Sequence, residues 1–377
     1  MLSDKSYNFY QEDQEIVVGA PPALSTEPEV RPTPLSALAF NDVPAELHFV
    51  RSHFTVPTLD PASWRLEVNG AVERELSFSL PKLKRRPVRT QTVVLECAGH
   101  RRNEFHPATP GLQWGVGAVS EAHWTGVSLS ALLQEVSPIS GACEVVFEAA
   151  DSGLHRSSTN EVTFARSIPL ERALAGDVLL AWGMNGHPIP ARHGAPLRVI
   201  VPGSYGVASV KWLRRISVLE RPFTGPFQVD DYHLNGKPLP RVRVNSLIVE
   251  PSEGSTLLTG ATEVSGVAWG GPDGIAAVEV RVSGGPWQQT MLISPAEPNR
   301  LSRWRAAVSL PPGEHRLEAR ARDFSGVLQP ERATWNPLGY ANNSIHAIRV
   351  RSVSASGHSA ASIQVPAAPV RRLRTDD

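Results

Sequence analysis

The chain has 377 residues, 41% hydrophobic and 20% charged, and its 37 lysines and arginines balance 37 aspartates and glutamates. This length predicts about two domains, and the balanced charge excludes a general attraction to nucleic acid or to anionic membranes. No apolar run is long enough to span a membrane. Only two cysteines occur, Cys97 and Cys143, which excludes a disulfide framework and fits a reducing compartment. With no signal peptide or twin arginine at the N-terminus, a cytoplasmic protein is expected.

The N-terminal part of the chain predicts an extended arm and then a β-hairpin. Residues 1–40 are polar and rich in proline, which indicates an arm along the surface. Apolar and polar residues alternate in 64–68 and again in 76–80, and the pair Asn69-Gly70 between them favours a hairpin.

The remainder of the first domain mixes short helices with buried strands. An amphipathic pattern predicts a helix at 127–136, and Pro169 precedes a second helix at 170–175. Apolar runs at 177–182, 196–202 and 210–218 predict buried strands. We therefore expect an α+β domain over about residues 41–235. Cys143 begins a strand pattern, where it is expected to pack in the interior.

The second half of the chain predicts an antiparallel β-sandwich. Apolar residues alternate with polar ones in 278–282, 304–310 and 317–321, and turns rich in glycine and proline separate these runs. Short strands at regular spacing without helical patterns are typical of a sandwich. We place this domain at 241–351 and expect the small and charged residues of 352–377 to form a disordered tail.

The most informative segment runs from Val94 to Phe105. An apolar stretch predicts a buried strand that ends at Cys97, and two arginines, Arg101 and Arg102, follow closely. A thiolate at a strand end is a soft metal ligand on a rigid element, and adjacent guanidinium groups form an anion site. This combination indicates metal chemistry on a small oxyanion.

The string Cys-Ala-Gly-His-Arg-Arg at 97–102 resembles the C-A-G-N-R-R signature of the sulfite oxidase family of molybdenum-pterin enzymes, with His100 at the usual asparagine. The resemblance covers most of residues 45–350, in the order and spacing of the family. Further segments that resemble family motifs are 49–54, 111–118, 123–127, 184–198, 201–213 and 230–232.

The resemblance implies a mixed α/β sulfite-oxidase-type molybdopterin domain, followed by an Ig-like β-sandwich that forms a homodimer. Molybdenum would be bound by the Cys97 thiolate and by the dithiolene of the pterin, and no haem or flavin is expected. Taken alone, His193 or Lys211 has an ordinary structural interpretation, and only the joint pattern points to a cofactor. The implied cofactor-binding residues are Phe49, Arg51, His53, Cys97, Asp151, His193, Arg198, Ser209 and Lys211.

The substrate site implied by the resemblance consists of Arg51, Arg102, Trp114 and Tyr232. Two arginines can hold a tetrahedral-sized anion through charge-assisted hydrogen bonds. The implied reaction is the oxidation of sulfite to sulfate by oxygen-atom transfer at molybdenum, with electrons passed to an external cytochrome or to oxygen. Arg101 is expected to form a surface salt bridge instead.

One departure from the family affects the substrate. Leu338 in Trp335-Asn336-Pro337-Leu338-Gly339 stands where the family has an arginine in W-N-L-R-G, unless Arg300 or Arg303 takes its place. A nitrate-reductase-type domain or a reductase of S- or N-oxides therefore stays as the alternative.

Two other classes of protein compete with this interpretation. Cys97, His100 and His106 have a spacing that could bind zinc, which would suit a hydrolase. A serine hydrolase is not indicated, because Gly203-Ser204-Tyr205-Gly206 does not match the G-x-S-x-G nucleophile elbow. A β-sandwich binding protein without enzymatic activity would explain only the second half of the chain.

Overall fold

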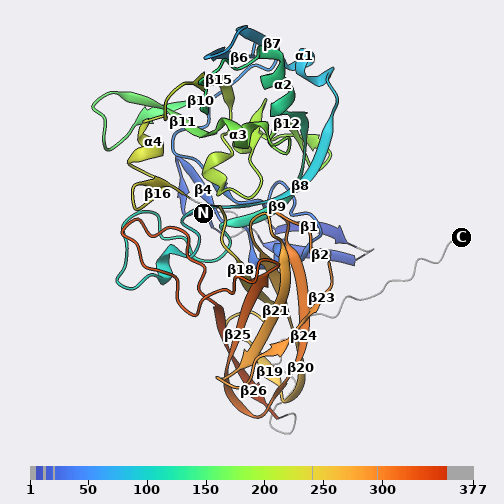
Figure 1. The fold of residues 1–377 in the computed structure, drawn as a ribbon. Coiled ribbons are helices and arrows are strands. Elements are labelled where there is room, and N and C mark those ends of the chain that lie inside the picture. Colours follow the sequence, from blue (N-terminus) through green and yellow to red (C-terminus); the bar gives the residue numbers. More distant parts are fainter. Residues whose placement is uncertain (1–5, 12–13, 20–21, 240, 295, 355–377) are drawn as a thin grey trace, which may run out of the picture.

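The computed structural model describes residues 6–11, 14–19, 22–239, 241–294 and 296–354. The first and second halves of the chain form separate groups of sheets, one above the other in Figure 1. Among the described residues, none of the helices has the length and apolar character needed to cross a membrane.

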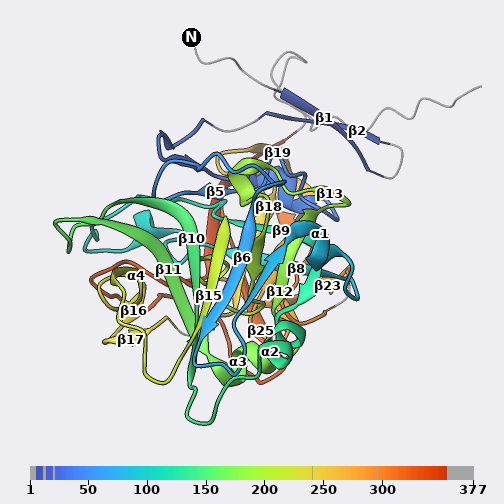
Figure 2. The ribbon, with the colours of Figure 1, turned by 90° about the horizontal axis from the view of Figure 1, so that it is seen from above.

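The first domain is built mainly from two β-sheets. One is five-stranded, in the order β11-β10-β15-β6-β7, with β15 and β6 parallel and its other neighbours antiparallel; Figure 2 shows most of these strands side by side. Its strands are β6 (Arg65–Gly70), β7 (Leu76–Ser79), β10 (Glu144–Leu154), β11 (Glu161–Pro169) and β15 (Leu213–Leu219). The second sheet contains β8 (Arg89–Glu96), β9 (Val119–Ser128), β12 (Leu179–Met184), β13 (His187–Pro188) and β14 (Arg198–Ile200).

The helices are few and short, so the domain is more strongly β than the α+β prediction implied. Helix α2 buries Leu129, Leu132, Leu133 and Val136, which follow helical spacing and confirm the predicted amphipathic segment. The α-helices are α1 (Leu80–Lys84), α2 (Leu129–Val136), α3 (Leu170–Leu174) and α4 (Pro226–Val229). The 3₁₀ helices are η1 (Leu35–Ala39), η2 (Arg102–Glu104), η3 (Ala191–His193) and η4 (Gly206–Ala208).

The predicted hairpin of β6 and β7 is confirmed, but its turn lies elsewhere. Asn69 and Gly70 belong to β6, and the connection uses the residues after them. Gly70 has a positive φ of 94°, and a Cβ there would lie 2.3 Å from the carbonyl oxygen of Val218. Glycine is therefore required by the close approach of β15 as well as by the backbone conformation.

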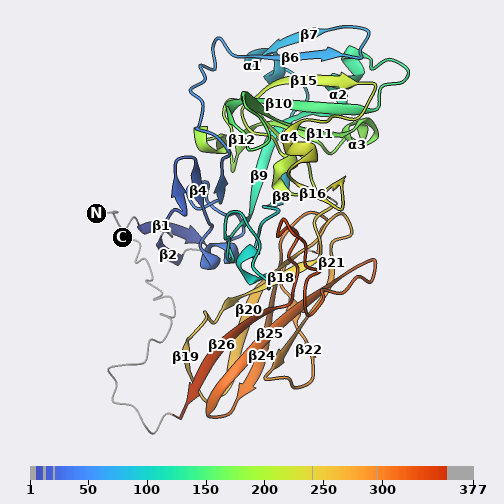
Figure 3. The same cartoon turned by 90° about the vertical axis from the view of Figure 1, so that its left-hand side faces the viewer.

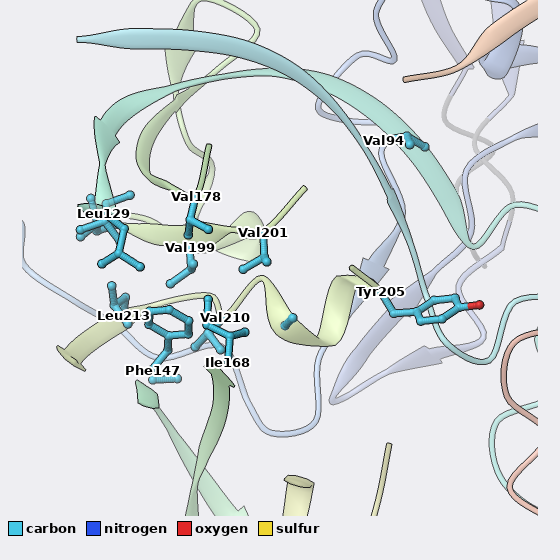
Figure 4. Packing of buried hydrophobic residues seen from close by; sticks show 14 of the residues in the cluster. Val94, Leu129, Phe147, Ile168, Val178, Val199, Val201, Tyr205, Val210 and Leu213 are labelled. Atoms are coloured by element: carbon cyan, nitrogen blue, oxygen red, sulfur yellow. The ribbon is translucent and has the colours of Figure 1, made fainter. Parts of the chain in front are cut away.

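The core of the first domain joins strands and helices that are distant in the sequence. Figure 4 shows Leu129, Val178 and Val199 gathered with Phe147 and Leu213 in one buried cluster. The same cluster includes Val210 and Ala208, which flank Ser209. Packing thereby fixes the segment that carries part of the candidate site.

The second domain consists of two sheets, which Figure 3 shows below the first domain, and it has its own buried core. Trp304, Val278 and Leu317 are buried between them, in agreement with the alternation in the sequence. One sheet contains β18 (Asn245–Glu250), β20 (Gly260–Trp269), β23 (Met291–Leu292) and β24 (Ser302–Leu310). The other contains β19 (Thr256–Leu258), β21 (Ile275–Val282), β22 (Gln288–Gln289), β25 (Gly313–Asp323) and β26 (His346–Val353).

The N-terminal arm forms short strands. Strand β4 pairs with β5, so that Val30 lies opposite Arg51. The short pairs of the chain are β1 (Ser6–Gln11) with β2 (Gln14–Gly19), β3 (Ser25–Thr26) with β4 (Glu29–Arg31), β4 with β5 (Val50–Arg51), and β16 (His233–Leu234) with β17 (Lys237–Pro238). Of the predicted tail, residues 352 and 353 belong to β26, and 355–377 lie outside the described residues.

Buried polar groups join the two domains. Arg101 is only 1% exposed, and its guanidinium pairs with Glu104 while donating to the carbonyl oxygens of Ser344 and Ile345. The expected surface salt bridge of Arg101 is therefore wrong, because both domains enclose this side chain. Cys143 was also misjudged: its side chain is exposed just before β10.

Candidate active site

Cys97 follows directly after β8 and lies where two cavities meet. Its backbone N–H donates to the carbonyl oxygen of Ala118 at 2.8 Å, which holds the strand end in place. The side chain is 8% exposed, and burial raises the pKa of the thiol, while Arg51 and Arg102 oppose this rise. A cation bound here would favour the thiolate.

The first cavity, which we name the basic cavity, brings together every residue predicted to bind the cofactor. The sequence placed these residues on segments up to 162 positions apart, from residue 49 to residue 211. Its lining includes Phe49, Arg51, His53, Cys97, Asp151, His193, Arg198, Ser209 and Lys211.

Buried cations dominate the basic cavity. Arg198 donates to the carbonyl oxygens of His193 and Ser209, at 2.8 and 2.9 Å, and burial lowers its pKa to about 9. Lys211 donates to the hydroxyl of Ser52 at 2.9 Å, and burial, followed by the charge of Arg198, lowers its pKa to about 7. The lining has three cations, Arg51, Arg198 and Lys211, but only one carboxyl group, that of Asp151, so this cavity suits an anionic group.

Several buried polar atoms around this cavity have no partner among the described residues. They include Nε of Arg198, Oδ1 of Asp151 and Nε2 of His48. Buried polar atoms in native proteins are normally paired, so these atoms indicate a polar ligand. Burial raises the pKa of Asp151 to about 6, with Lys211 opposing the rise.

The histidines of the basic cavity are held neutral. Burial lowers the pKa of His48 to about 3 and the pKa of His193 well below its ordinary value. His193 shares a hydrogen bond of 2.8 Å with the carbonyl oxygen of Ala45, which leaves its ring fixed. His48 lines the cavity but was missed by the sequence interpretation, because nothing in its local pattern distinguishes it from a packing residue.

The second cavity, which we name the outer cavity, has a volume of about 470 Å³ and contains the predicted substrate residues. It shares Arg51, His53, Cys97 and Tyr232 with the basic cavity. Arg102 and Trp114 complete the predicted set. Trp114 is buried and meets Phe49 edge to face at 6.5 Å between ring centres.

Arg102 is fixed by groups from both domains. Its Nε donates to the carbonyl oxygen of Gly339 at 3.2 Å and its Nη1 to that of Leu112 at 2.8 Å. Its guanidinium lies 4.9 Å from the ring centre of Tyr340. The loop after β8 and the loop before β26 run side by side in Figure 1. The guanidinium is therefore held before any ligand arrives.

Tyr232 is held by His53 and by the ring of Tyr340. The phenol oxygen lies 2.5 Å from Nε2 of His53, and the rings of Tyr232 and Tyr340 stack with centres 5.1 Å apart. Burial and then the charge of Arg51 lower the pKa of His53 well below its ordinary value. Burial raises the pKa of Tyr232. Both groups are therefore neutral near pH 7.

Leu338 lines the outer cavity, but the two arginines suggested as its replacement do not. Arg300 and Arg303 lie near the buried carboxylate of Glu121, with N–O distances of 3.7 and 3.5 Å. Arg156 lines the outer cavity instead. The sequence interpretation missed Arg156 and Tyr340, since both reach the cavity through tertiary contacts.

The zinc alternative is not supported. His100 is buried against Trp269, with ring centres 5.6 Å apart, whereas His106 is exposed. Within the described part of the chain, no three His, Cys, Asp or Glu side chains form a group that could hold a metal ion.

Two known protein families match this chain. The family described as "Oxidoreductase molybdopterin binding domain" matches residues 53–227, and "Mo-co oxidoreductase dimerisation domain" matches residues 238–353.

Individual proteins of known function are also similar to this chain in sequence or structure. Mitochondrial sulfite oxidase of Mus musculus is 34% identical over 88% of this chain and 63% of its own length, and sulfite oxidase of Gallus gallus is 35% identical over 80% and 72%. A nitrate reductase of Hordeum vulgare is 33% identical over 80% of this chain but only 38% of its own length. The crystal structure of the sulfane dehydrogenase SoxCD from Paracoccus pantotrophus matches with a TM-score of 0.76 and 29% identity, covering 86% of this chain and 84% of that one.

The chain belongs to the sulfite oxidase family of molybdopterin-binding oxidoreductases. It spans about 63% of the length of the mouse and rat sulfite oxidases.

Proposed function

We propose that this chain holds a molybdenum-pterin cofactor in the basic cavity and oxidises sulfite to sulfate in the outer cavity. The observation that carries the proposal is the position of Cys97, which lines both cavities beside Arg51 and Tyr232. A thiol there can bind a metal while facing an anion site formed by Arg51 and Arg102.

The residues of the basic cavity fit an anionic pterin. Lys211 and Arg198 are the cations for its phosphate, and the unpartnered Nε of Arg198 is a free donor. The remainder of the group would be held by His53, His193, Ser209, Asp151 and Phe49, and Cys97 would ligate molybdenum. When bound, the cofactor supplies two-electron redox chemistry and exchange of an oxygen atom with water.

The chain's own residues bind and orient the substrate. Arg51 and Arg102 hold the oxyanion, and the fixed geometry of Arg102 reduces the entropy lost on binding. Nε2 of His53 and the Tyr232 oxygen share a hydrogen bond, and in the tautomer with the proton on Nε2 the phenol hydrogen is left for a substrate oxygen. Trp114 closes the wall beside Phe49 and keeps water away.

The proposal also covers the domain organisation, the electron acceptor and the location of the protein. We propose boundaries of 1–40 for the N-terminal arm, 41–235 for the catalytic domain and 241–351 for an Ig-like domain that makes a homodimer. The match of 238–353 to a dimerisation domain supports the last of these. Electrons pass to a separate acceptor, a cytochrome or oxygen, and the proposed location is cytoplasmic.

A second candidate is the reduction of nitrate or of an S- or N-oxide. Leu338 favours it, because an apolar residue in the outer cavity leaves fewer cations for a doubly charged anion. The relationship to a plant nitrate reductase is compatible with this alternative.

The deciding experiment is sulfite-dependent reduction of ferricyanide by protein shown to contain molybdenum. We expect saturable turnover that is abolished in Cys97→Ser, since the serine hydroxyl is a poor ligand for a soft metal. Cys143→Ser is the matched control and should keep full activity, because Cys143 is exposed and lines neither cavity. Nitrate reduction without sulfite turnover would favour the second candidate, and unchanged activity in Cys97→Ser would refute the cofactor assignment.

A further inference from the structure

The outer cavity is larger than a small sulfur oxyanion requires. Its volume is about 470 Å³, within the range of roughly 300–1,000 Å³ found for sites that hold drug-sized ligands. A metal centre at Cys97 would fill part of this space. Besides the two arginines, the lining includes Pro110, Leu338 and the exposed Arg156.

The charge in the cavity is concentrated at its inner end. Arg51 and Arg102 lie beside Cys97, and Nη2 of Arg102 has no hydrogen-bond partner among the described residues. At the mouth, Arg156 is 61% exposed and pairs with Asp231 at 2.5 Å, and Asp231 also contacts Nε2 of His155 at 3.0 Å. The mouth is therefore nearly neutral, and the attraction for an anion lies next to the metal-binding position.

The wall between these ends is apolar and firmly supported. Leu338 packs against the core of the first domain, and Leu112 packs against the neighbouring cluster that contains Cys97 and Trp114. Pro110 and the ring of Tyr340 complete this wall. A bare oxyanion would leave this apolar surface in contact with water. A ligand with an apolar substituent would cover it, which is favourable by about 25 cal/mol for each Å² removed from water.

We propose that the physiological substrate class of this site is an organic sulfinate, R–SO₂⁻, in which R is apolar. The sulfinate group binds Arg51 and Arg102 with its sulfur toward the metal position at Cys97, and R lies along Leu338, Leu112 and Pro110. This inference rests on the proposed function above and specifies its substrate.

The reaction balances as a two-electron oxidation. The sulfur lone pair forms a new S–O bond, so that R–SO₂⁻ and water give R–SO₃⁻, two protons and two electrons. No carbon–sulfur bond breaks. The electrons leave to the external acceptor, which is a pair of ferricyanide ions in the assay.

A homologous series of alkanesulfinates tests this inference. Methane-, butane- and hexanesulfinate share the reacting group and differ only in apolar length, and they are compared with sulfite using protein shown to contain molybdenum. We expect kcat/KM to rise by about tenfold or more from methane- to hexanesulfinate. Calorimetric binding of the corresponding sulfonates, with sulfate as reference, should show the same order without depending on turnover.

Two variants test whether Leu338 causes the dependence of kcat/KM on the length of the alkyl chain. Leu338→Arg places a cation in the apolar wall and should remove most of the gain with chain length, so that the kcat/KM values for hexane- and methanesulfinate become similar. Leu174→Arg is the matched control, because Leu174 is exposed on α3 and lines neither cavity, and it should keep the wild-type series.

The outcomes separate the two proposals. Turnover of sulfite without turnover of any alkanesulfinate, or a kcat/KM independent of chain length, would overturn the sulfinate assignment and leave the oxidase function standing. Absence of turnover with sulfite and with every sulfinate would overturn both. The wild-type series decides the question by itself if Leu338→Arg does not fold.

Discussion

The guanidinium of Arg102, from the loop after β8, lies 4.9 Å from the ring centre of Tyr340, which belongs to the segment before β26. The two residues are 238 positions apart in the chain, so the second domain helps to position the arginine that we propose binds substrate. Tyr340 also stacks on Tyr232, and one aromatic ring thereby supports two of the proposed substrate residues.

Tyr340 is a positioning residue, and its removal should act mainly on binding. Tyr340→Leu should raise KM for the anionic substrate by about fivefold to tenfold, corresponding to ~1 kcal/mol of lost cation–π and packing energy, with a smaller effect on kcat. Tyr340→Phe retains the ring and should restore KM. Steady-state kinetics of both variants provides the measurement, and an equal loss in both would show that the phenol hydroxyl is what matters.

Lys211 should contribute to retention of the cofactor. Lys211→Met removes a half-buried cation that we assign to the pterin phosphate, and the affinity for the cofactor should fall about tenfold or more. Molybdenum and pterin per chain, measured in purified protein, give the result. Lys84→Met is the control, because Lys84 is exposed at the end of α1. Full cofactor occupancy in Lys211→Met would remove this residue from the phosphate site.

The same lysine should make the free energy of unfolding of the cofactor-free protein depend on pH. The pKa of Lys211 is about 7 in the folded chain and near its ordinary 10.5 when unfolded. Between these values the unfolded state binds more protons, so the free energy of unfolding should increase as pH rises from about 7 toward 10. Unfolding by urea at several pH values measures this slope. Lys211→Met should lose that part of the slope, and identical slopes in both proteins would contradict the burial argument.

Arg101 should matter for stability more than for substrate binding. Its side chain is buried, pairs with Glu104 and donates to two carbonyl oxygens of the second domain. Arg101→Met breaks these contacts and should lower the free energy of unfolding by about 3 kcal/mol. Arg74→Met, at an exposed position, should change it little. Chemical unfolding compares the two variants, and a similar stability for both would show that the buried contacts of Arg101 have little net value.

Local patterns in the sequence were enough to find Cys97. An apolar run predicts the strand that ends before it, and the arginines that follow are adjacent in the chain, so no tertiary information was needed. The alternation in 278–282 and 304–310 likewise predicted strands with one buried face, because side chains of a strand alternate between its two sides. The family resemblance then supplied distant residues such as Arg198 and Lys211, which line the basic cavity beside Cys97.

Other features depended on contacts that no local pattern encodes. Arg101 and Arg102 are neighbours with the same chemistry, yet the fold buries the first between the domains and turns the second into the outer cavity. Tyr340 and Arg156 reach that cavity from segments far from Cys97 in sequence. By itself, the sequence predicted a thiol at a strand end, a pair of arginines close behind it and the strands that carry them. Only the tertiary structure decided which cations share a cavity, because burial and pairing are properties of the packed chain.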